Sequence, residues 1–344
     1  MAKRSVNQET PIYEAVDRGG SLARGLGKSG SKLRSGRYRA QLTAFSLLTL
    51  TAVIVLLSAP WAKEQSTSAM TVGSPTVDAN GVKYYPVRSV YQGFQPQIIR
   101  VLEPTHPASG KPRRILFVLP VDAGVDNTAS TWSDGLEELR LLNVQDRFNM
   151  TLVAPSFSYE PWYGDNDRDP RFRMESFIIH DLVPFSDTFA KGSVPQRYLI
   201  GFSKSGNGAL ILILKHPDIF NGAAAWDAPA QLSDIDAQGV SSPGALSTNF
   251  GTQANFNRYN IPLLISTNAE QFRTHSRLWI SGDEAAWTAD MSKLNNQLTA
   301  AGIPHSWTRG GSRAHSWNSG WLNDAVADLD AHVTFTTQNT ELHR

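Results

Sequence analysis

The sequence contains no cysteine among its 344 residues. A disulfide framework, a thiolate metal site and a cysteine nucleophile are therefore all excluded. The chain also lacks a strong net charge, because 32 lysines and arginines stand against 31 aspartates and glutamates. A formal net charge of +1 favours no nucleic-acid partner. The composition does allow a large core, since 41% of the residues are hydrophobic.

The excess of positive charge is concentrated at the N-terminus. Residues 1–40 contain nine lysines and arginines but only three acidic residues, so we predict a basic, disordered tail there. Residues 42–62 follow without a single charge, and 21 such residues are enough to cross a bilayer. Since positive flanks stay in the cytoplasm, the rest of the chain is expected to be exported.

We predict residues 41–62 to be a signal anchor or a signal peptide, and residues 63–80 to be a linker. Small residues at 58–62 suit cleavage, whereas the long leader favours a retained anchor. An uncleaved segment 42–62 would hold the protein on the outer face of the cytoplasmic membrane. A cleaved segment would leave it secreted or periplasmic.

Residues 81–340 alternate between strand and helix patterns, which predicts an α/β domain with a mostly parallel central sheet, helices on both faces and an antiparallel start. A polar, aromatic stretch at 157–172 is predicted to be a lid, and 229–275 an irregular insertion. The strands are expected at 82–90, 96–103, 114–119, 150–155, 198–200, 221–226, 277–281 and 305–309, and the helices at 134–148, 174–190, 209–215, 288–301 and 320–332.

The segment 196–210, QRYLIGFSKSGNGAL, contains the main candidate for chemistry. It reads as a strand, a sharp turn at Gly201 and then a helix, with Ser203 lifted out at the turn. Ser205 occupies the second glycine position of the G-x-S-x-G elbow, where a small residue is needed. The alternative interpretation is a Gly/Ser-rich loop without chemistry.

A serine nucleophile needs a histidine base that a carboxylate orients. In one known chain order of such triads, the serine comes first, the carboxylate follows a later strand, and the histidine follows the last strand. Of eight histidines, only His315 lies between the last predicted strand and the last helix. The favoured acid is Asp283, directly after a strand, with Asp290 and Asp227 as alternatives. The order Ser203, Asp283, His315 therefore predicts a catalytic triad.

The tetrahedral intermediate needs two N–H donors. One is expected from the backbone of Lys204 at the helix start. The other is expected from Asp122 or Val121 after the third strand, because Pro120 has no N–H.

No metal or cofactor is predicted. The alternating carboxylates of 165–169 resemble a calcium loop, but Pro170 and Ser176 stand where an EF-hand has glycine and glutamate. A solvated lid loop is the preferred interpretation.

Residues 82–335 resemble the putative esterase (esterase D-like) family of α/β-hydrolases, which includes feruloyl and acetyl-xylan esterases, S-formylglutathione hydrolase and mycolyltransferases. The resemblance is carried by the motifs GFSKSGNGAL at 201–210, HPDIF at 216–220 and AHSW at 314–317. It implies an α/β-hydrolase fold, with Ser203 as nucleophile, His315 as base and Asp283 as acid. Two departures are Ser205 and the sequence LPVDAG at 119–124, where many relatives have a His-Gly oxyanion loop.

These observations predict an exported serine hydrolase that cleaves carboxylic esters, carbohydrate-linked or from the cell envelope, through an acyl-enzyme. Two alternatives share the same fold: an acyltransferase with the same triad, and an inactive binding protein.

Overall fold

The computed structural model describes residues 70–108, 113–124, 132–191, 194–237, 244–282, 285–309 and 311–341, with side chains described up to residue 331. These residues all belong to one compact unit, 65–344. The predicted tail, the segment 41–62 and most of the predicted linker lie outside the described residues. No helix in the described ranges has both the length and the apolar character that crossing a bilayer requires.

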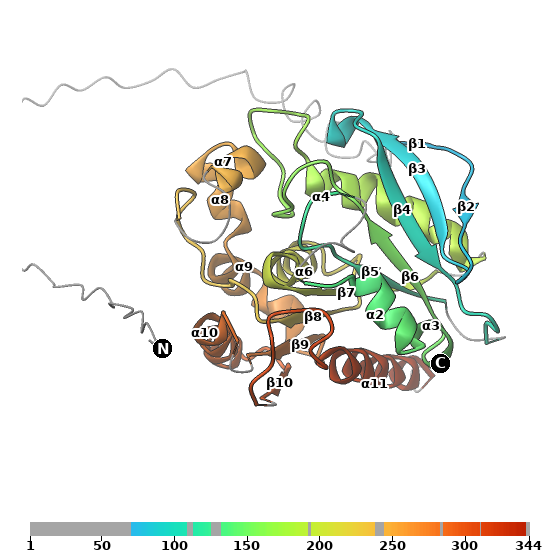
Figure 1. The fold of residues 1–344 in the computed structure, drawn as a ribbon. Coiled ribbons are helices and arrows are strands. Elements are labelled where there is room, and N and C mark those ends of the chain that lie inside the picture. Colours follow the sequence, from blue (N-terminus) through green and yellow to red (C-terminus); the bar gives the residue numbers. More distant parts are fainter. Residues whose placement is uncertain are drawn as a thin grey trace, which may run out of the picture. The chain divides into compact units, whose positions relative to one another are not determined.

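A single sheet runs through this unit, in the order β1-β3-β4-β6-β5-β7-β8-β9-β10, with β2 added onto β3 (Figure 1). The pairs β1–β3, β2–β3, β3–β4 and β4–β6 are antiparallel. The pairs β6–β5, β5–β7, β7–β8, β8–β9 and β9–β10 are parallel. The predicted antiparallel start is thereby confirmed. The bounds are β1 (Met70–Val72), β2 (Thr76–Val77), β3 (Lys83–Ser89), β4 (Gln97–Leu102), β5 (Arg114–Val118), β6 (Met150–Pro155), β7 (Gln196–Phe202), β8 (Gly222–Trp226), β9 (Leu278–Ser281) and β10 (Ser306–Thr308).

Both faces of the sheet are buried, as the continuous apolar runs predict. Because side chains alternate along a strand, Leu199 of β7 packs into one core, while Ile200 and Phe202 face the other. The first core contains residues of α4 (Met174–Ser176), α6 (Ser203–Lys215), α9 (Ile261–Asn268) and α10 (Thr288–Ala300). The second contains residues of α2 (Gly135–Leu141), α3 (Val144–Arg147) and α11 (Leu322–Glu341).

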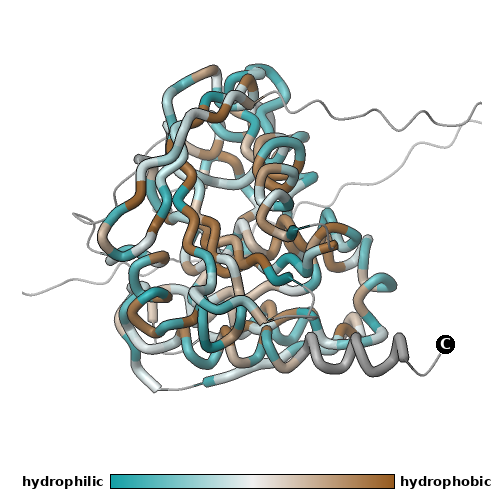
Figure 2. The backbone as a smooth tube through the Cα atoms, turned by 90° about the vertical axis from the view of Figure 1, so that its right-hand side faces the viewer, coloured by the Kyte–Doolittle hydropathy of each residue, from teal (hydrophilic) through white to brown (hydrophobic). Residues whose placement is uncertain are grey.

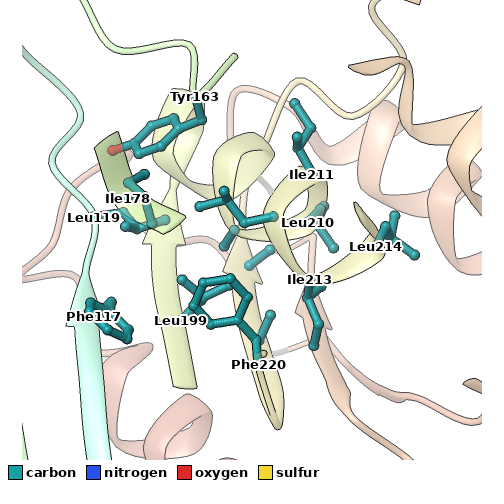
Figure 3. Packing of buried hydrophobic residues seen from close by; sticks show 14 of the residues in the cluster. Phe117, Leu119, Tyr163, Ile178, Leu199, Leu210, Ile211, Ile213, Leu214 and Phe220 are labelled. Atoms are coloured by element: carbon teal, nitrogen blue, oxygen red, sulfur yellow. The ribbon is translucent and has the colours of Figure 1, made fainter. Parts of the chain in front are cut away.

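Helix α6 is the centre of the first core. Its Leu210, Ile213 and neighbouring side chains pack beside Leu199 and Phe220 (Figure 3). Hydrophobic segments lie in the interior along the central strands (Figure 2). The helix makes its closest approaches to β7 and β8, so the start of α6 is fixed relative to the ends of both strands.

The folded part begins earlier than the predicted boundary at residue 81. Strands β1 and β2 pair with β3, so residues 70–80 belong to the sheet, and the predicted linker is wrong for them. These two strands are only three and two residues long, which is too short for a hydrophobic period to be recognised.

The predicted insertion 229–275 is also more regular than expected. It contains α7 (Ala245–Phe250), α8 (Gln253–Phe256), α9 and two 3₁₀ turns, Asn257–Tyr259 and Ala269–Phe272. Side chains begin two of these helices: Thr252 accepts a hydrogen bond from the N–H of Asn255, and Asn260 accepts one from Leu263. The polar residues that indicated irregular structure therefore act as helix caps.

Two predicted helices are interrupted. The helix predicted at 134–148 divides into α2 and α3, because Asn143 has a left-handed backbone. The region predicted as a helix at 174–190 contains α4, a π-helical stretch Phe177–Leu182, α5 (Val183–Asp187) and a 3₁₀ turn Thr188–Ala190.

Candidate active site

Ser203 lies at the turn between β7 and α6, as predicted. Its φ angle is +52°, a left-handed conformation that a serine rarely adopts. Its backbone N–H donates to the carbonyl of Asp227 at 3.1 Å, which fixes the turn against the end of β8. An added Cβ at Gly201 would lie 2.4 Å from the backbone of Ser205, so only glycine fits there. The strained turn is the geometry of a nucleophile elbow.

Ser205 does more than occupy little space. Its side chain is fully buried, its hydroxyl donates to the carbonyl of Phe202 at 2.8 Å, and it accepts from the Phe202 N–H at 3.1 Å. Two backbone groups next to Ser203 are thus satisfied by one hydroxyl. A glycine at this position would leave both without that partner.

The sheet brings the two strand ends together. Phe202 and Trp226 are register partners on the parallel strands β7 and β8. Ser203 follows the first and Asp227 follows the second. The imidazole of His315 lies over both aromatic rings, with centroid separations of 5.0 Å to Phe202 and 6.2 Å to Trp226. The predicted nucleophile and the predicted base therefore both lie at the carboxyl edge of the sheet.

The carboxylate that reaches His315 belongs to Asp227. Its Oδ2 lies 2.5 Å from Nδ1 of His315, and its side chain is completely buried. The same carboxylate accepts the N–H groups of Ala286 and Trp287 at 3.0 and 2.5 Å. Three donors therefore satisfy the buried charge and fix its orientation.

Of the other two acid candidates, only Asp290 belongs to the described residues, and it does not take this position. Asp283, the favoured one, lies outside them, so its predicted pairing with His315 stays a prediction. Asp290 is on α10 and accepts the N–H of Gln231 at 3.0 Å, with burial as the main cause of a raised pKa. Asp227, considered in the sequence as an alternative, is the carboxylate in contact with the imidazole.

The loop that was expected to supply the second oxyanion donor is fixed at several points. The N–H of Leu119 continues the pairing of β5 with β7 by donating to Ile200 at 3.0 Å. Tyr163 donates its hydroxyl to the carbonyl of Pro120 at 2.5 Å. The N–H of Gly124 donates to Phe157 at 2.8 Å. The loop 119–124 is therefore held by both the sheet and the lid.

Two of the predicted donors are available for a ligand. Among the described residues, no group accepts a hydrogen bond from the backbone N–H of Lys204 or of Val121. The side chain of Lys204 contacts Asp122, the third predicted donor residue, at 3.4 Å. This contact joins the residue after Ser203 to the loop 119–124.

Trp132 is a part of the site that the sequence did not reveal. Its ring meets the imidazole of His315 edge-on at 5.0 Å, and its carbonyl accepts from the Ser316 hydroxyl and the Trp317 N–H at 3.0 and 2.9 Å. Trp132 thus holds the loop that carries the predicted base, His315. Trp317 and Trp321 are both buried in the second core.

The carboxylates of the lid are occupied by protein groups. Asp165 accepts the N–H of Ser176 at 3.0 Å, Asp167 the hydroxyl of Thr252 at 2.5 Å, and Asp169 a bidentate contact from Arg171. Within the described part of the chain, no group of three or more His, Cys, Asp or Glu side chains could hold a metal ion.

Three comparisons bear on this site. Residues 155–343, just over half of the chain, match the model of the family described as Putative esterase. A search of curated proteins finds no significant match.

Solved structures share the fold at low identity. An S-formylglutathione hydrolase from Agrobacterium tumefaciens is 16% identical, with a TM-score of 0.59 over 76% of this chain and 99% of that one. A ferulic acid esterase is 15% identical, with a TM-score of 0.54 over 79% and 98% of the two chains. The fluorophosphonate-binding serine hydrolase F of Staphylococcus aureus is 14% identical, with a TM-score of 0.55 over 75% and 99%.

At 14–16% identity these structures establish the fold, and the family match adds the class of reaction. The chain belongs to the putative esterase family and is a carboxylic ester hydrolase with an α/β-hydrolase fold.

Proposed function

We propose that this protein is a serine esterase in which Ser203 is the nucleophile, His315 the general base and Asp227 the orienting acid. One observation carries the proposal: Ser203 and Asp227 directly follow the register partners Phe202 and Trp226, and the His315 ring packs on both partners. The position of Ser203 and Asp227 at adjacent strand ends supports their pairing with one imidazole.

In the proposed reaction, Nδ1–H of His315 donates to Asp227, which leaves Nε2 as the acceptor. Nε2 takes the hydroxyl proton as Oγ of Ser203 attacks the ester carbonyl. The tetrahedral intermediate collapses, and the alcohol leaves with that proton. Water then attacks the acyl-enzyme with the same base, which releases the acid and restores the serine.

The negative charge that develops on the carbonyl oxygen requires preorganised donors. We assign them to the backbone N–H of Lys204, at the start of α6, and to that of Val121 or Asp122. The start of α6 adds the positive end of a helix dipole.

The substrate class follows from the predicted location. The basic tail 1–40 and the uncharged segment 42–62 support export, either as an anchored protein or as a secreted or periplasmic one. An exported esterase meets carbohydrate-linked or envelope esters, and these are the substrates that we propose. The names of the S-formylglutathione hydrolase and the ferulic acid esterase refer to two different acyl groups, so they do not identify the acyl group that this chain would cleave.

A fluorophosphonate probe tests the nucleophile. The Oγ of Ser203 should displace fluoride and add the phosphonyl group, with the adduct located by peptide mass spectrometry. Ser203→Ala should abolish labelling, whereas Ser186→Ala, at a buried serine in α5, should not. A folded wild-type protein without an adduct would favour the binding-protein alternative.

Product analysis tests the acceptor. With a simple ester and a competing alcohol, free acid is expected as the main product, and a dominant new ester would indicate acyl transfer. Fractionation of cells tests the location: release of the protein by salt alone contradicts an anchor, and an intact N-terminus on the exported form contradicts cleavage.

A further inference from the structure

Lys204 is placed to act on the reaction through two different groups. It follows Ser203 in the first turn of α6, so its backbone N–H is one of the proposed oxyanion donors. Its side chain does not extend into solvent, since only 13% of it is exposed. A lysine beside a nucleophile would ordinarily leave its ammonium in water, so this burial calls for a partner.

The ammonium has two carboxylate partners from distant parts of the chain. Nζ lies 2.5 Å from Oε1 of Glu160 in the lid and 3.4 Å from Oδ1 of Asp122 in the loop after β5. These side chains are 23% and 35% exposed, so water screens the pairs only partly. The contacts join the elbow, the lid and the oxyanion loop at one point.

We propose that Lys204 is a positioning residue: its ammonium holds the loop that carries Val121 and Asp122 at the distance from the Lys204 N–H that a carbonyl oxygen requires. The proposal rests on the assignment of Ser203 and of these donors under the proposed function. One residue then sets both halves of the oxyanion site, one through its backbone and the other through its side chain.

Charge supports the same conclusion. Without the ammonium, the carboxylates of Glu160 and Asp122 would stand together near the position where negative charge develops. Their repulsion would move the two loops apart, and their field would oppose the oxyanion. The lysine therefore matters more for the transition state than for substrate binding.

The chain provides a matched control at the other end of the same helix. The Lys215 side chain is 15% exposed, and its Nζ lies 2.8 Å from Oε2 of Glu175. Eleven helical positions separate the two lysines, roughly 16 Å along the axis. Lys204→Met and Lys215→Met each remove a partly buried lysine–glutamate pair, but only the first touches the oxyanion loop.

The test compares kcat, KM and the melting temperature of these variants with an activated ester as substrate. Lys204→Met should lower kcat by about ten- to a hundredfold and change KM by less than about threefold, because a misplaced donor costs most in the transition state. Lys204→Arg should recover part of kcat, and Lys215→Met should leave kcat within about twofold. Equal effects of the two methionine variants on kcat would overturn the proposal.

Single changes of the partners keep the test decisive where Lys204→Met does not fold. Glu160→Gln and Asp122→Asn each weaken one contact and should lower kcat by about three- to tenfold, again with little change in KM. An unchanged kcat in both would overturn the proposal. Failure of the proposed function is separate, because it would appear as an active Ser203→Ala protein.

Discussion

The Nδ1 atom of His315 lies 2.5 Å from the Oδ2 atom of Asp227, although the two residues are 88 positions apart. Asp227 comes from the end of β8, the direct neighbour of β7, whereas Asp283 follows β9, one strand further away. The carboxylate that contacts the imidazole therefore follows the strand directly beside the one that leads into Ser203.

Replacing this carboxylate should remove most of the activity. We expect Asp227→Asn to lower kcat by about a thousandfold to ten-thousandfold, because the imidazole loses the group that holds its tautomer and stabilises its charge. Steady-state kinetics with an activated ester measures the loss, and the melting temperature reports whether the fold survives.

Asp283→Asn and Asp290→Asn are the controls, and we expect each to retain kcat within about threefold. A large loss in Asp283→Asn, with an active Asp227→Asn, would restore the acid that the sequence favours.

The sequence was sufficient to predict most of the sheet but not the identity of the contacting carboxylate. The apolar run 150–155 coincides with β6, and the run 198–200 lies within β7, because strands buried on both faces are continuously hydrophobic. Asp227 and Asp283 both follow such runs. Which of them meets His315 depends on strand order and loop path, and neither is encoded in local periodicity.

Other features escaped prediction because tertiary contacts create them. Trp132 contacts His315 across 183 positions, and no local pattern marks a tryptophan whose carbonyl anchors a distant loop. The helices of 245–268 contain many asparagines and serines, whose helix propensity is low. Packing of Phe250, Phe256 and Tyr259 against one another stabilises this region instead.

Tyr163 should affect both stability and turnover through the oxyanion loop. Its ring lies beside α6 (Figure 3), and its hydroxyl donates to the carbonyl of Pro120. Burial, together with the charge of Asp122, raises the pKa of Tyr163 well above its ordinary value, so the hydroxyl remains a donor. Tyr163→Phe should cost about 1–3 kcal/mol in the free energy of unfolding, because a buried carbonyl loses its partner.

We also expect Tyr163→Phe to lower kcat several-fold, since the freed carbonyl lies next to the donor residues. Tyr198→Phe is the control: Tyr198 is buried too, but its hydroxyl has no hydrogen-bond partner among the described residues. Urea unfolding and kinetics should separate the two variants, and equal behaviour would contradict a role for the Pro120 contact.

Ser205 should be needed for its hydroxyl and not only for its size. Ser205→Ala and Ser205→Gly should each lower the free energy of unfolding by about 1–2 kcal/mol, because both remove the groups that bind Phe202 N–H and C=O. Ser186→Ala, which loses a single bond to the carbonyl of Val183, should cost less. If Ser205→Gly were as stable as the wild type, the hydroxyl would be dispensable and the family's usual glycine equivalent.

Glu175 should make the protein more stable above pH 4.5 than below it. Burial raises the pKa of this carboxyl, but hydrogen bonds from His216, Lys215 and Tyr259, and the charge of Lys215, more than offset burial and lower the pKa to about 2. A lowered pKa in the folded state means that the unfolded state binds the proton first as the pH falls. The stabilisation, on the order of 3 kcal/mol, is therefore complete above the unfolded pKa and declines as the pH drops from about 4.5 towards 2.

The variant Glu175→Gln isolates this contribution. At pH 7 it should be less stable than the wild type by a few kcal/mol, because Lys215 and His216 lose the carboxylate that binds them. The difference should shrink as the pH falls from 4.5 to 3, since the wild-type carboxylate then loses its advantage. Glu270→Gln is the control: its side chain is 82% exposed and its pair with Arg273 lies in water, so its effect should be small at every pH. A Glu175→Gln difference that stays constant from pH 7 to pH 3 would mean that the side chain stabilises α6 by packing and not by charge.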